Sequence, residues 1–274
     1  MRQQEVVEAF EQIGARAAVS HLTWNSFRGM SAPSPVARFG DFALDIVRDN
    51  AGERFDLVFR PEDQIEVLDI QPSDAHLLLR VATRSREQPG TFLCGHDERH
   101  WFIAAIPESA RTRTVQQAKD ALKPDAVWES MREHSVPMSH RDRRKTAAFV
   151  RQGEWFFVPR KDLEFPYREV LRDEPIRRGA GKPHVCQFMH RTAGQWVYVT
   201  DERPNGMSET EFFSVPKARR NKWDWTRTLR DARVFVRGSV AHPDHQTIHL
   251  REWHEVVLNR ESEASAMSFV AFLD

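Results

Sequence analysis

The sequence has few cysteines, no long apolar run and no net charge. Only two cysteines, Cys94 and Cys186, occur in 274 residues, which excludes a disulfide scaffold and is typical of a reducing compartment. No apolar stretch approaches the ~18 residues that a membrane-spanning helix needs, so no membrane partner is expected. With 40% hydrophobic and 29% charged residues, the chain is neither disordered nor fibrous and has enough apolar residues to bury a core.

Common targeting and catalytic signatures are also missing. The first residues carry acids at Glu5, Glu8 and Glu11, unlike a signal or transit peptide, so a cytoplasmic location is expected. The chain has no P-loop, no Rossmann fingerprint, no G-x-S-x-G and no H-E-x-x-H motif. Enzymes that are recognised by these motifs are therefore excluded.

The hydrophobic pattern predicts an α+β fold with a mostly antiparallel, hairpin-rich sheet. Helical spacing over 4–20 predicts an N-terminal helix, and 114–134 predicts a helical segment broken at Pro124. Residues 29–40 are expected to form a loop, and 185–189 is expected to pair with 195–200. Further strands are expected at 42–47, 55–59, 65–70, 75–82, 91–94, 101–106, 154–158, 234–240 and 247–258, with a six-residue polar tip at 95–100.

The charge is distributed unevenly along the chain. Residues 1–110 hold 11 basic and 17 acidic side chains, whereas residues 111–250 hold 27 basic and 18 acidic ones. This predicts an acidic α+β N-terminal region at 1–110 and a basic, β-rich C-terminal region at 111–274, with a single domain as the alternative. Such asymmetry is typical of a protein that faces a polyanion, or of an internal acid–base interface.

A histidine-rich turn is the first candidate site. His242-Pro-Asp-His245 lies between two expected strands, and four histidines fall within 242–254. Two imidazoles three residues apart, with Asp244 between them, can bind a divalent metal or position a general base. His242, Asp244 and His245 are therefore the predicted catalytic residues. The alternative is a structural turn, because Pro-Asp alone explains the local geometry, with His254 as a core residue.

A second candidate site combines both cysteines with histidines. Cys94 and His96, and likewise His184 and Cys186, are separated by one residue, and zinc accepts this mixture of sulfur and nitrogen ligands. These four residues are the predicted metal ligands. Zinc and magnesium both stay open as the divalent cofactor of the chain. The alternative is two buried thiols and an exposed polar turn, since the usual C-x2-C spacing is absent.

Basic residues interleaved with tryptophan form the third candidate. Arginine suits bidentate phosphate contacts, and tryptophan stacks on unpaired bases. The alternative is a solvated charged face. The predicted nucleic-acid-binding residues are Arg143, Arg144, Arg219, Arg220, Trp223, Trp225, Arg227 and Arg230. The expected partner is single-stranded nucleic acid or RNA, with a protein partner as the second hypothesis.

Three phrases of the latter half resemble a group of bacterial proteins of unknown activity. They are GEWFFVP within 151–159, RGxGKPH within 178–184, and HPDHxTIxLxxWH within 242–254. The resemblance implies a bacterial, cytoplasmic origin and brings no activity, cofactor or catalytic residue with it.

These features favour an intracellular nucleic-acid-associated protein that acts as a metal-assisted phosphodiesterase or RNA-processing enzyme. Two rival hypotheses remain open at this point. One is a non-catalytic protein-interaction module that uses its acidic and basic regions for assembly, and the other is a zinc-stabilised structural module.

Overall fold

The computed structural model describes residues 3–21, 42–84, 87–178, 182–200, 203–230 and 232–265. It is 23% helical and 48% strand, with an N-terminal helix and several antiparallel sheets, so the predicted α+β class is confirmed. Within these ranges no helix is both long and apolar enough to cross a membrane. The loop predicted at 29–40 lies outside the described residues.

The chain folds into two compact units. Of the described residues, the first unit contains those up to Lys123 together with 260–265, and the second contains those from Pro124 to Asn259. The charge pattern predicts a boundary after residue 110. The division lies later because helix α3 (Val115–Ala121) packs on a sheet of the first unit.

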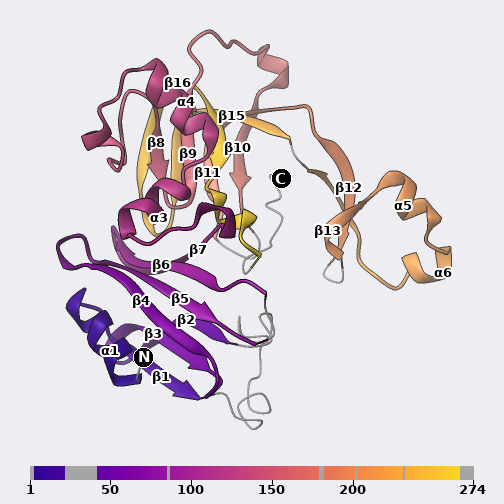
Figure 1. Ribbon diagram of the computed structural model, residues 1–274. Coiled ribbons are helices and arrows are strands. Elements are labelled where there is room, and N and C mark those ends of the chain that lie inside the picture. Colours follow the sequence, from indigo (N-terminus) through magenta and orange to yellow (C-terminus); the bar gives the residue numbers. More distant parts are fainter. Residues whose placement is uncertain are drawn as a thin grey trace. The chain divides into compact units, whose positions relative to one another are not determined.

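The first unit contains two sheets (Figure 1). A three-stranded sheet has the order β1-β3-β2, with β1 parallel to β3, and a four-stranded antiparallel sheet has the order β4-β5-β6-β7. Helix α1 (Gln3–Gln12) lies against β1 and buries Val6 and Phe10. The strands are β1 (Ala17–His21), β2 (Ala43–Asp49), β3 (Gly52–Phe59), β4 (Gln64–Gln71), β5 (His76–Ala82), β6 (Gly90–Asp97) and β7 (His100–Ile106).

Strand β5 is buried on both faces, which explains its uninterrupted apolar sequence. Leu77 and Leu79 belong to a core cluster that also contains Cys94. Leu78 belongs to a separate cluster with Val115 of α3. Because alternate residues of a strand point to opposite faces, each face of β5 packs in its own core.

The hairpin that carries Cys94 and His96 is longer than predicted. Strands β6 and β7 pair as far as Asp97 and His100, so the expected six-residue tip is reduced to two residues. His96 lies opposite Trp101, and their rings contact edge to face with centroids 4.9 Å apart. This aromatic contact continues the ladder through residues that appear polar in the sequence.

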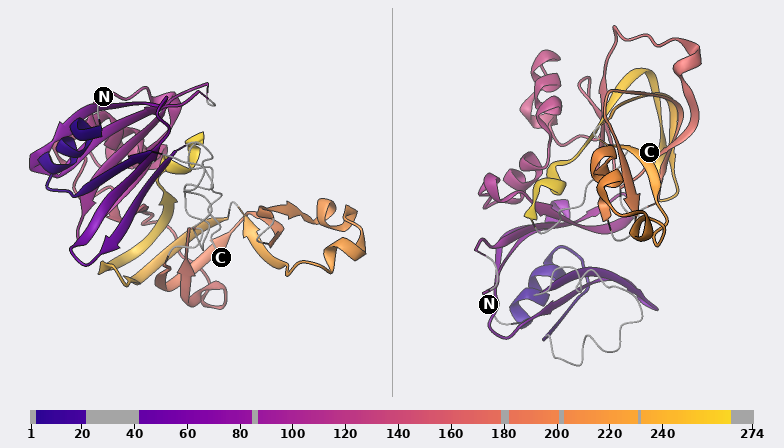
Figure 2. Two further views of the ribbon diagram at one scale, coloured as in Figure 1. Left: turned by 90° about the horizontal axis from the view of Figure 1, so that it is seen from below. Right: turned by 90° about the vertical axis from the view of Figure 1, so that its right-hand side faces the viewer.

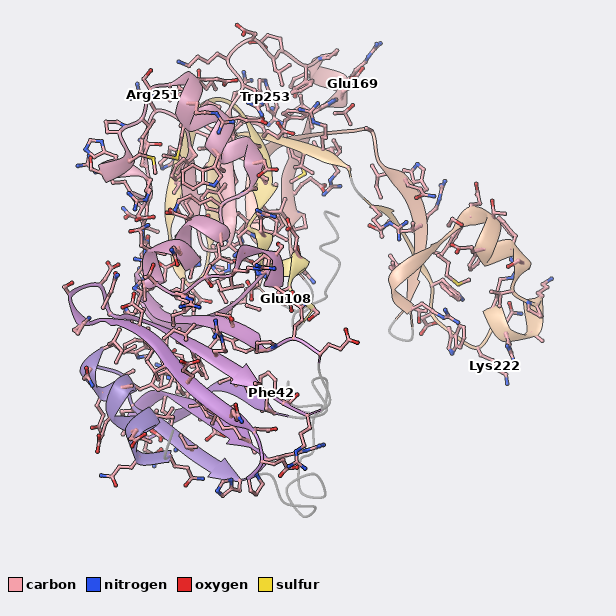
Figure 3. The ribbon with its side chains drawn as sticks, in the orientation of Figure 1. Phe42, Glu108, Glu169, Lys222, Arg251 and Trp253 are labelled. Carbon is pink, nitrogen blue, oxygen red and sulfur yellow. The ribbon has the colours of Figure 1, made fainter. Side chains whose placement is uncertain are left out.

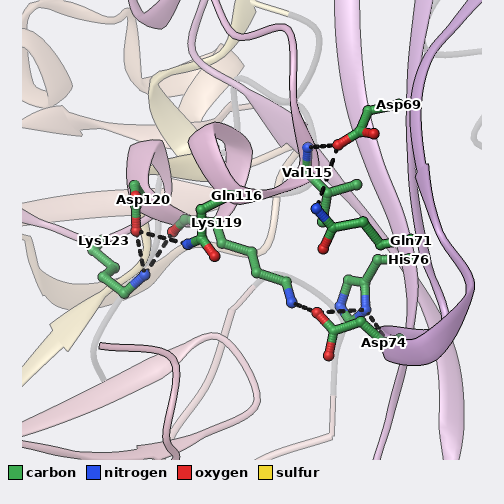
Figure 4. Close-up of polar contacts among 9 residues, drawn as sticks. All are labelled: Asp69, Gln71, Asp74, His76, Val115, Gln116, Lys119, Asp120 and Lys123. Carbon is green, nitrogen blue, oxygen red and sulfur yellow. Dashed lines mark hydrogen bonds and ion pairs between the residues drawn. The ribbon is translucent and has the colours of Figure 1, made fainter. Parts of the chain in front are cut away.

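Polar contacts attach helix α3 to the β4–β5 hairpin (Figure 4). The backbone amide of Val115 donates to Asp69 Oδ2 at 2.7 Å, and Lys119 forms an ion pair with Asp74. The side chain of Thr114 caps the helix. These contacts attach α3 to the first unit. The helix that follows Pro124, α4 (Asp125–Glu133), belongs to the second unit.

The second unit is built on a six-stranded sheet of order β10-β11-β15-β16-β9-β8. Helix α4 packs on one face of it through Val127 and Met131, in a buried cluster with Phe156 and Val158. All neighbouring strands of this sheet are antiparallel. They are β8 (Val150–Gln152), β9 (Trp155–Pro159), β10 (Leu171–Ile176), β11 (His184–Thr192), β15 (Arg233–His242) and β16 (His245–Leu258).

The opposite face of this sheet curves around a second core cluster. Trp155 of β9 and Ile176 of β10 share that cluster although β16, β15 and β11 separate their strands in the sheet. Strand β16 carries an irregularity between Leu250 and His254, where its register with β15 shifts. The shift allows the consecutive Trp253 and His254 to be buried together, while Arg251 is exposed (Figure 3).

Residues 195–230 lie between β11 and β15 in the sequence, and their described part forms a small sheet of order β13-β12-β14. We call this segment the inserted module. In Figure 1 and in the left view of Figure 2 its two helices lie at one end of the small sheet. Its elements are β12 (Gln195–Thr200), β13 (Arg203–Ser208), α5 (Glu209–Ser214), α6 (Lys217–Arg220) and β14 (Thr226–Arg230).

The predicted pairing of 185–189 with 195–200 is wrong. Strand β11 pairs with β10 and β15, whereas β12 pairs with β13 and β14. The two residues between them, Ala193 and Gly194, both have positive φ, at 60° and 94°. Two successive residues with positive φ also occur in tight hairpin turns, so the φ values at this position do not by themselves distinguish a hairpin from the observed pairing.

Candidate functional site

Three histidines meet at one end of the six-stranded sheet. His242 and His245 flank the two-residue turn between β15 and β16 and form the last residue pair of that hairpin. His184 is the first residue of β11, and the pairing of Val185 with Ala241 sets it beside His242. We call His184, His242 and His245 the histidine cluster.

The ring nitrogens of the cluster lie close enough to share one ion. One nitrogen from each residue lies within 4.8 Å of the other two. Ring centroids are 4.2 Å apart for His184 and His242, 4.7 Å for His242 and His245, and 5.9 Å for His184 and His245. Zinc–nitrogen bonds of about 2.0–2.1 Å place ligand nitrogens about 3.4 Å apart, so binding draws the rings together by about 1 Å.

His184 is the buried member of the cluster and has no hydrogen-bond partner. The residue is 1% exposed, and neither Nδ1 nor Nε2 makes a hydrogen bond. A buried polar atom without a partner costs about 1–3 kcal/mol. Burial, followed by the neighbouring His242 and His245, lowers the pKa of His184 to about 3. The ring is therefore neutral at pH 7, which is the form that binds metal ions.

Gly153, in the turn between β8 and β9, faces the cluster. Its φ is +59°, in the left-handed region. A Cβ at this position would lie 3.1 Å from His245 Nε2 and 3.8 Å from His184 Nε2. These two nitrogens therefore border a space that any larger residue at 153 would enter.

Neighbouring groups hold His242 and Asp244 in place. The backbone amide of Asp244 donates to His242 Nδ1 at 3.1 Å, and Nε2 lies 3.3 Å from the Lys182 carbonyl oxygen. These two contacts engage both ring nitrogens, so His242 would give up one of them to bind a metal ion. Burial and then the neighbouring His245 lower the pKa of His242. The Asp244 carboxylate accepts hydrogen bonds from Lys182 Nζ at 2.7 and 2.8 Å. Asp244, predicted to act with the two histidines, thus braces the turn and lies outside the histidine cluster.

An apolar shell surrounds the buried end of the site. The ring of Trp155 meets His184 edge to face, with centroids 6.4 Å apart. Cys186 is fully buried, and its thiol lies 3.9 Å from the His184 carbonyl oxygen. Burial raises the pKa of the Cys186 thiol to about 12. A shell of this kind limits access of water to a metal site and strengthens electrostatic interactions inside it.

The four predicted zinc ligands are distributed over both units. Cys94 and His96 lie on β6 of the first unit, and His184 and Cys186 lie on β11 of the second. Cys94 is buried, which raises the pKa of its thiol, whereas His96 is exposed. Among the described residues, the cluster of candidate metal ligands includes only His184 from this set.

The predicted nucleic-acid residues form two groups. Arg143 and Arg144 lie between α4 and β8, outside the inserted module. Arg143 is exposed, whereas Arg144 is half-buried and its pKa is lowered by burial and then by Arg151. The six other residues all lie in the inserted module, on α6, on β14 or in the loop between them: Arg219, Arg220, Trp223, Trp225, Arg227 and Arg230.

Sequence analysis missed Gly153 and Trp196. Trp196 lies on β12 and is 49% exposed, and the sequence offers only the excess of eight tryptophans over two tyrosines as a hint. Gly153 becomes notable only when the β8–β9 turn reaches His184 and His245. A glycine in a turn is too common in sequences to indicate such a contact.

A separate cavity of about 510 Å³ in the second unit is lined partly by Arg160, Arg233 and Phe165. Each of these arginines forms an ion pair with Glu255 at 2.8 Å. Both guanidinium groups thus already contact a carboxylate within the protein, and no residue of the histidine cluster lines this cavity. The cavity is therefore a weaker candidate than the cluster.

Comparison of the chain with protein-family models, with curated proteins and with solved structures found no match in any of the three.

Proposed function

We propose that this protein binds one divalent transition-metal ion through the histidine cluster and uses it to hydrolyse phosphodiester bonds in nucleic acid. The observation that carries the proposal is His184, a buried imidazole with two unpartnered nitrogens beside two further imidazoles. Buried polar groups are nearly always satisfied in native proteins. An ion shared with His242 and His245 would supply a partner for one of the two nitrogens of His184.

Three imidazoles favour zinc over magnesium, the other ion that the sequence left open. Magnesium prefers oxygen ligands in octahedral geometry, whereas imidazole nitrogen suits zinc and its neighbours in the first transition row. The carboxylate in the turn, Asp244, is engaged by Lys182. The donor set is therefore nitrogen alone.

A centre with three histidine ligands retains a position for water. Bound zinc lowers the pKa of such a water from about 15.7 to about 7, which supplies a nucleophile at neutral pH. The chain's own residues would hold the metal ion. The β15–β16 turn, which contacts Lys182, places His242 and His245 beside the site, and β11 places His184 there. This arrangement is suited to metal-assisted hydrolysis.

The basic composition of the second unit supports a phosphodiester substrate. Residues 124–259 carry 24 basic and 19 acidic side chains, and the histidine cluster lies within this stretch. Positive charge of this extent attracts the phosphate backbone through a long-range field and through release of counterions. Nucleic acid is therefore the polyanion that we assign as substrate.

Zinc binding is the first experiment. Calorimetry on the purified protein is expected to give about one equivalent of Zn²⁺ per chain, with binding lost in His184→Ala and His242→Ala. His249→Ala is the matched control, because His249 is an exposed histidine on the same hairpin and lies outside the cluster. Wild-type protein that binds Zn²⁺ no more tightly than His184→Ala contradicts the metal centre.

Hydrolysis is tested separately on zinc-loaded protein. Single-stranded and duplex DNA and RNA, together with bis(p-nitrophenyl) phosphate, cover the phosphodiester class. Cleavage is expected from the wild type and His249→Ala and not from His184→Ala. Stoichiometric zinc without cleavage of any of these substrates would reject the enzyme and favour a zinc-stabilised structural module.

A further inference from the structure

The inserted module carries a row of aromatic side chains. Trp196 and Tyr198 are two residues apart on β12 and share one face of the small sheet. Tyr198 stacks on Phe212 of α5, with centroids 3.8 Å apart and ring planes 10° apart. Phe213 continues the row, with its centroid 6.3 Å from that of Tyr198. We call Trp196, Tyr198, Phe212 and Phe213 the aromatic row.

The two ends of the aromatic row are open to solvent. Trp196 is 49% exposed and Phe213 is 59% exposed. The core of the module is made by other residues, including Val197, which is fully buried on the opposite face of β12. Large apolar rings left together at a surface, after the core is filled, indicate a binding site.

Trp225, which the sequence suggests as a base-stacking residue, is used inside the module. Its ring meets Phe212 edge to face at 5.0 Å, and its indole N–H donates to the Arg220 carbonyl at 3.0 Å. Trp223 packs against Trp225 with centroids 5.7 Å apart. Trp225 thus packs against Phe212 and helps to hold the aromatic row in place.

Guanidinium groups lie over both open rings. Arg227 Cζ lies 4.4 Å from the centroid of Trp196, and Arg220 Cζ lies 5.1 Å from that of Phe213. The segment from Lys217 to Arg230 contains six basic residues and one acidic residue, and Lys222 projects from it (Figure 3). Unpaired bases stack on aromatic rings and on guanidinium planes alike, and arginine pairs well with phosphate.

From these contacts we infer that the inserted module binds single-stranded nucleic acid. Bases stack at Trp196 and Phe213, and the arginines above those rings contact phosphates. Single strands are required because paired bases hide their faces in the duplex stack. Because guanidinium groups cover the rings, a polyanion is a better-matched partner for the aromatic row than the apolar surface of another protein is. The inference names the substrate of the proposed function, and it rests on that proposal only for the chemistry that follows binding.

The test is binding of labelled oligo(dT) and oligo(rU) to the full chain, by fluorescence anisotropy at low salt in EDTA. Trp196→Ala and Phe213→Ala are each expected to weaken binding by about 5- to 100-fold. Trp196→Phe keeps a ring and is expected to retain most of the affinity, which separates stacking from loss of folding. Tyr167→Ala is the matched control: Tyr167 is 77% exposed beneath Arg172, at 5.7 Å, and lies outside the module.

Three results would overturn the inference. The first is no binding to either oligonucleotide at low salt. The second is binding that Tyr167→Ala weakens as much as Trp196→Ala does, which indicates attachment to any polyanion. The third is a protein partner captured through Trp196 with no affinity for oligonucleotides. Because EDTA removes metal, the binding measured here does not involve the metal centre, so a failed zinc titration leaves this test unaffected.

Discussion

Gly153 tests the position of the metal without changing any of the proposed ligands. A methyl group at this position would lie 3.1 Å from His245 Nε2 and close to His184 Nε2, in the space that both nitrogens border. Gly153→Ala is therefore expected to weaken Zn²⁺ binding by about tenfold or more in calorimetry. The left-handed backbone adds a folding cost of about 1–2 kcal/mol.

A second glycine separates these two effects. Gly14 has φ +80°, and a Cβ there would meet nothing within 4 Å. Gly14→Ala is expected to lose a similar amount of stability and to leave zinc affinity in the second unit unchanged. Equal zinc affinity in both variants would show that the ion does not occupy the space beside Gly153.

Glu255 links two arginines and gives the fold a defined pH dependence. Burial raises its pKa, but hydrogen bonds from Arg233 and Arg160 outweigh burial, so the pKa in the folded protein is lowered. The stabilisation is thus present above the unfolded pKa of about 4.3 and is lost as pH falls through the lower folded value. Glu255→Gln is expected to cost about 1–3 kcal/mol at pH 7.

Urea unfolding at several pH values checks this expectation. The difference in unfolding free energy between wild type and Glu255→Gln is expected to shrink below pH ~4, because the wild-type carboxylate is then protonated as well. A difference that stays constant or grows as the pH falls would show that the ion pairs with Arg160 and Arg233 are not its source.

At the scale of elements, turns and breaks were predictable because the residues that make them act locally. The turn after β15 was predicted from His242-Pro-Asp-His245, and the β2–β3 hairpin from Asp49-Asn-Ala-Gly52; both are present. Pro124 separates α3 from α4 as predicted. Proline, glycine and aspartate restrict the backbone at their own positions, so such features follow from short stretches of sequence.

Pairing across the inserted module was not predictable from local pattern. His184 joins His242 only because β11 pairs with β15, and the whole module lies between those strands in the sequence. In the sequence His184 is grouped with Cys186 by spacing, whereas the structure places the Cys186 side chain in the apolar core. Strand alternation also cannot indicate the register shift of β16, which buries Trp253 and His254 together.

The ion pair that ties the β15–β16 turn to β11 is expected to contribute to the stability of the turn and not to zinc binding. The Lys182–Asp244 ion pair ties the turn to the start of β11, and Lys182 is 60% exposed. An exposed pair contributes about 0–1 kcal/mol, so Asp244→Asn is expected to lower stability only slightly and to keep one bound Zn²⁺. Zinc titration and thermal unfolding of this variant measure both quantities. Loss of zinc in Asp244→Asn would indicate that Asp244 is a ligand and belongs to the site together with His242 and His245.

At the scale of the whole molecule, both proposed sites lie in the second unit. The histidine cluster and the aromatic row both lie between Pro124 and Asn259, whereas the first unit contributes only Cys94 and His96 to the predicted sites. The acidic excess of residues 1–110 and the basic excess of 111–250 follow nearly the same division. A negatively charged region disfavours nucleic acid, which leaves the second unit as the part suited to bind it.

Metal binding is therefore expected to stabilise one unit and not the other. Zinc at a hundred times its dissociation constant adds about 2.7 kcal/mol to the stability of the unit that binds it. Hydrogen exchange measured by mass spectrometry, with and without Zn²⁺, is expected to slow in β11, β15 and β16 and to stay unchanged in β5 and β6. His184→Ala is the control and is expected to show no effect of zinc in any strand. Slower exchange in β6 that persists in His184→Ala would place zinc at Cys94 and His96, and so would contradict the histidine cluster as the metal centre.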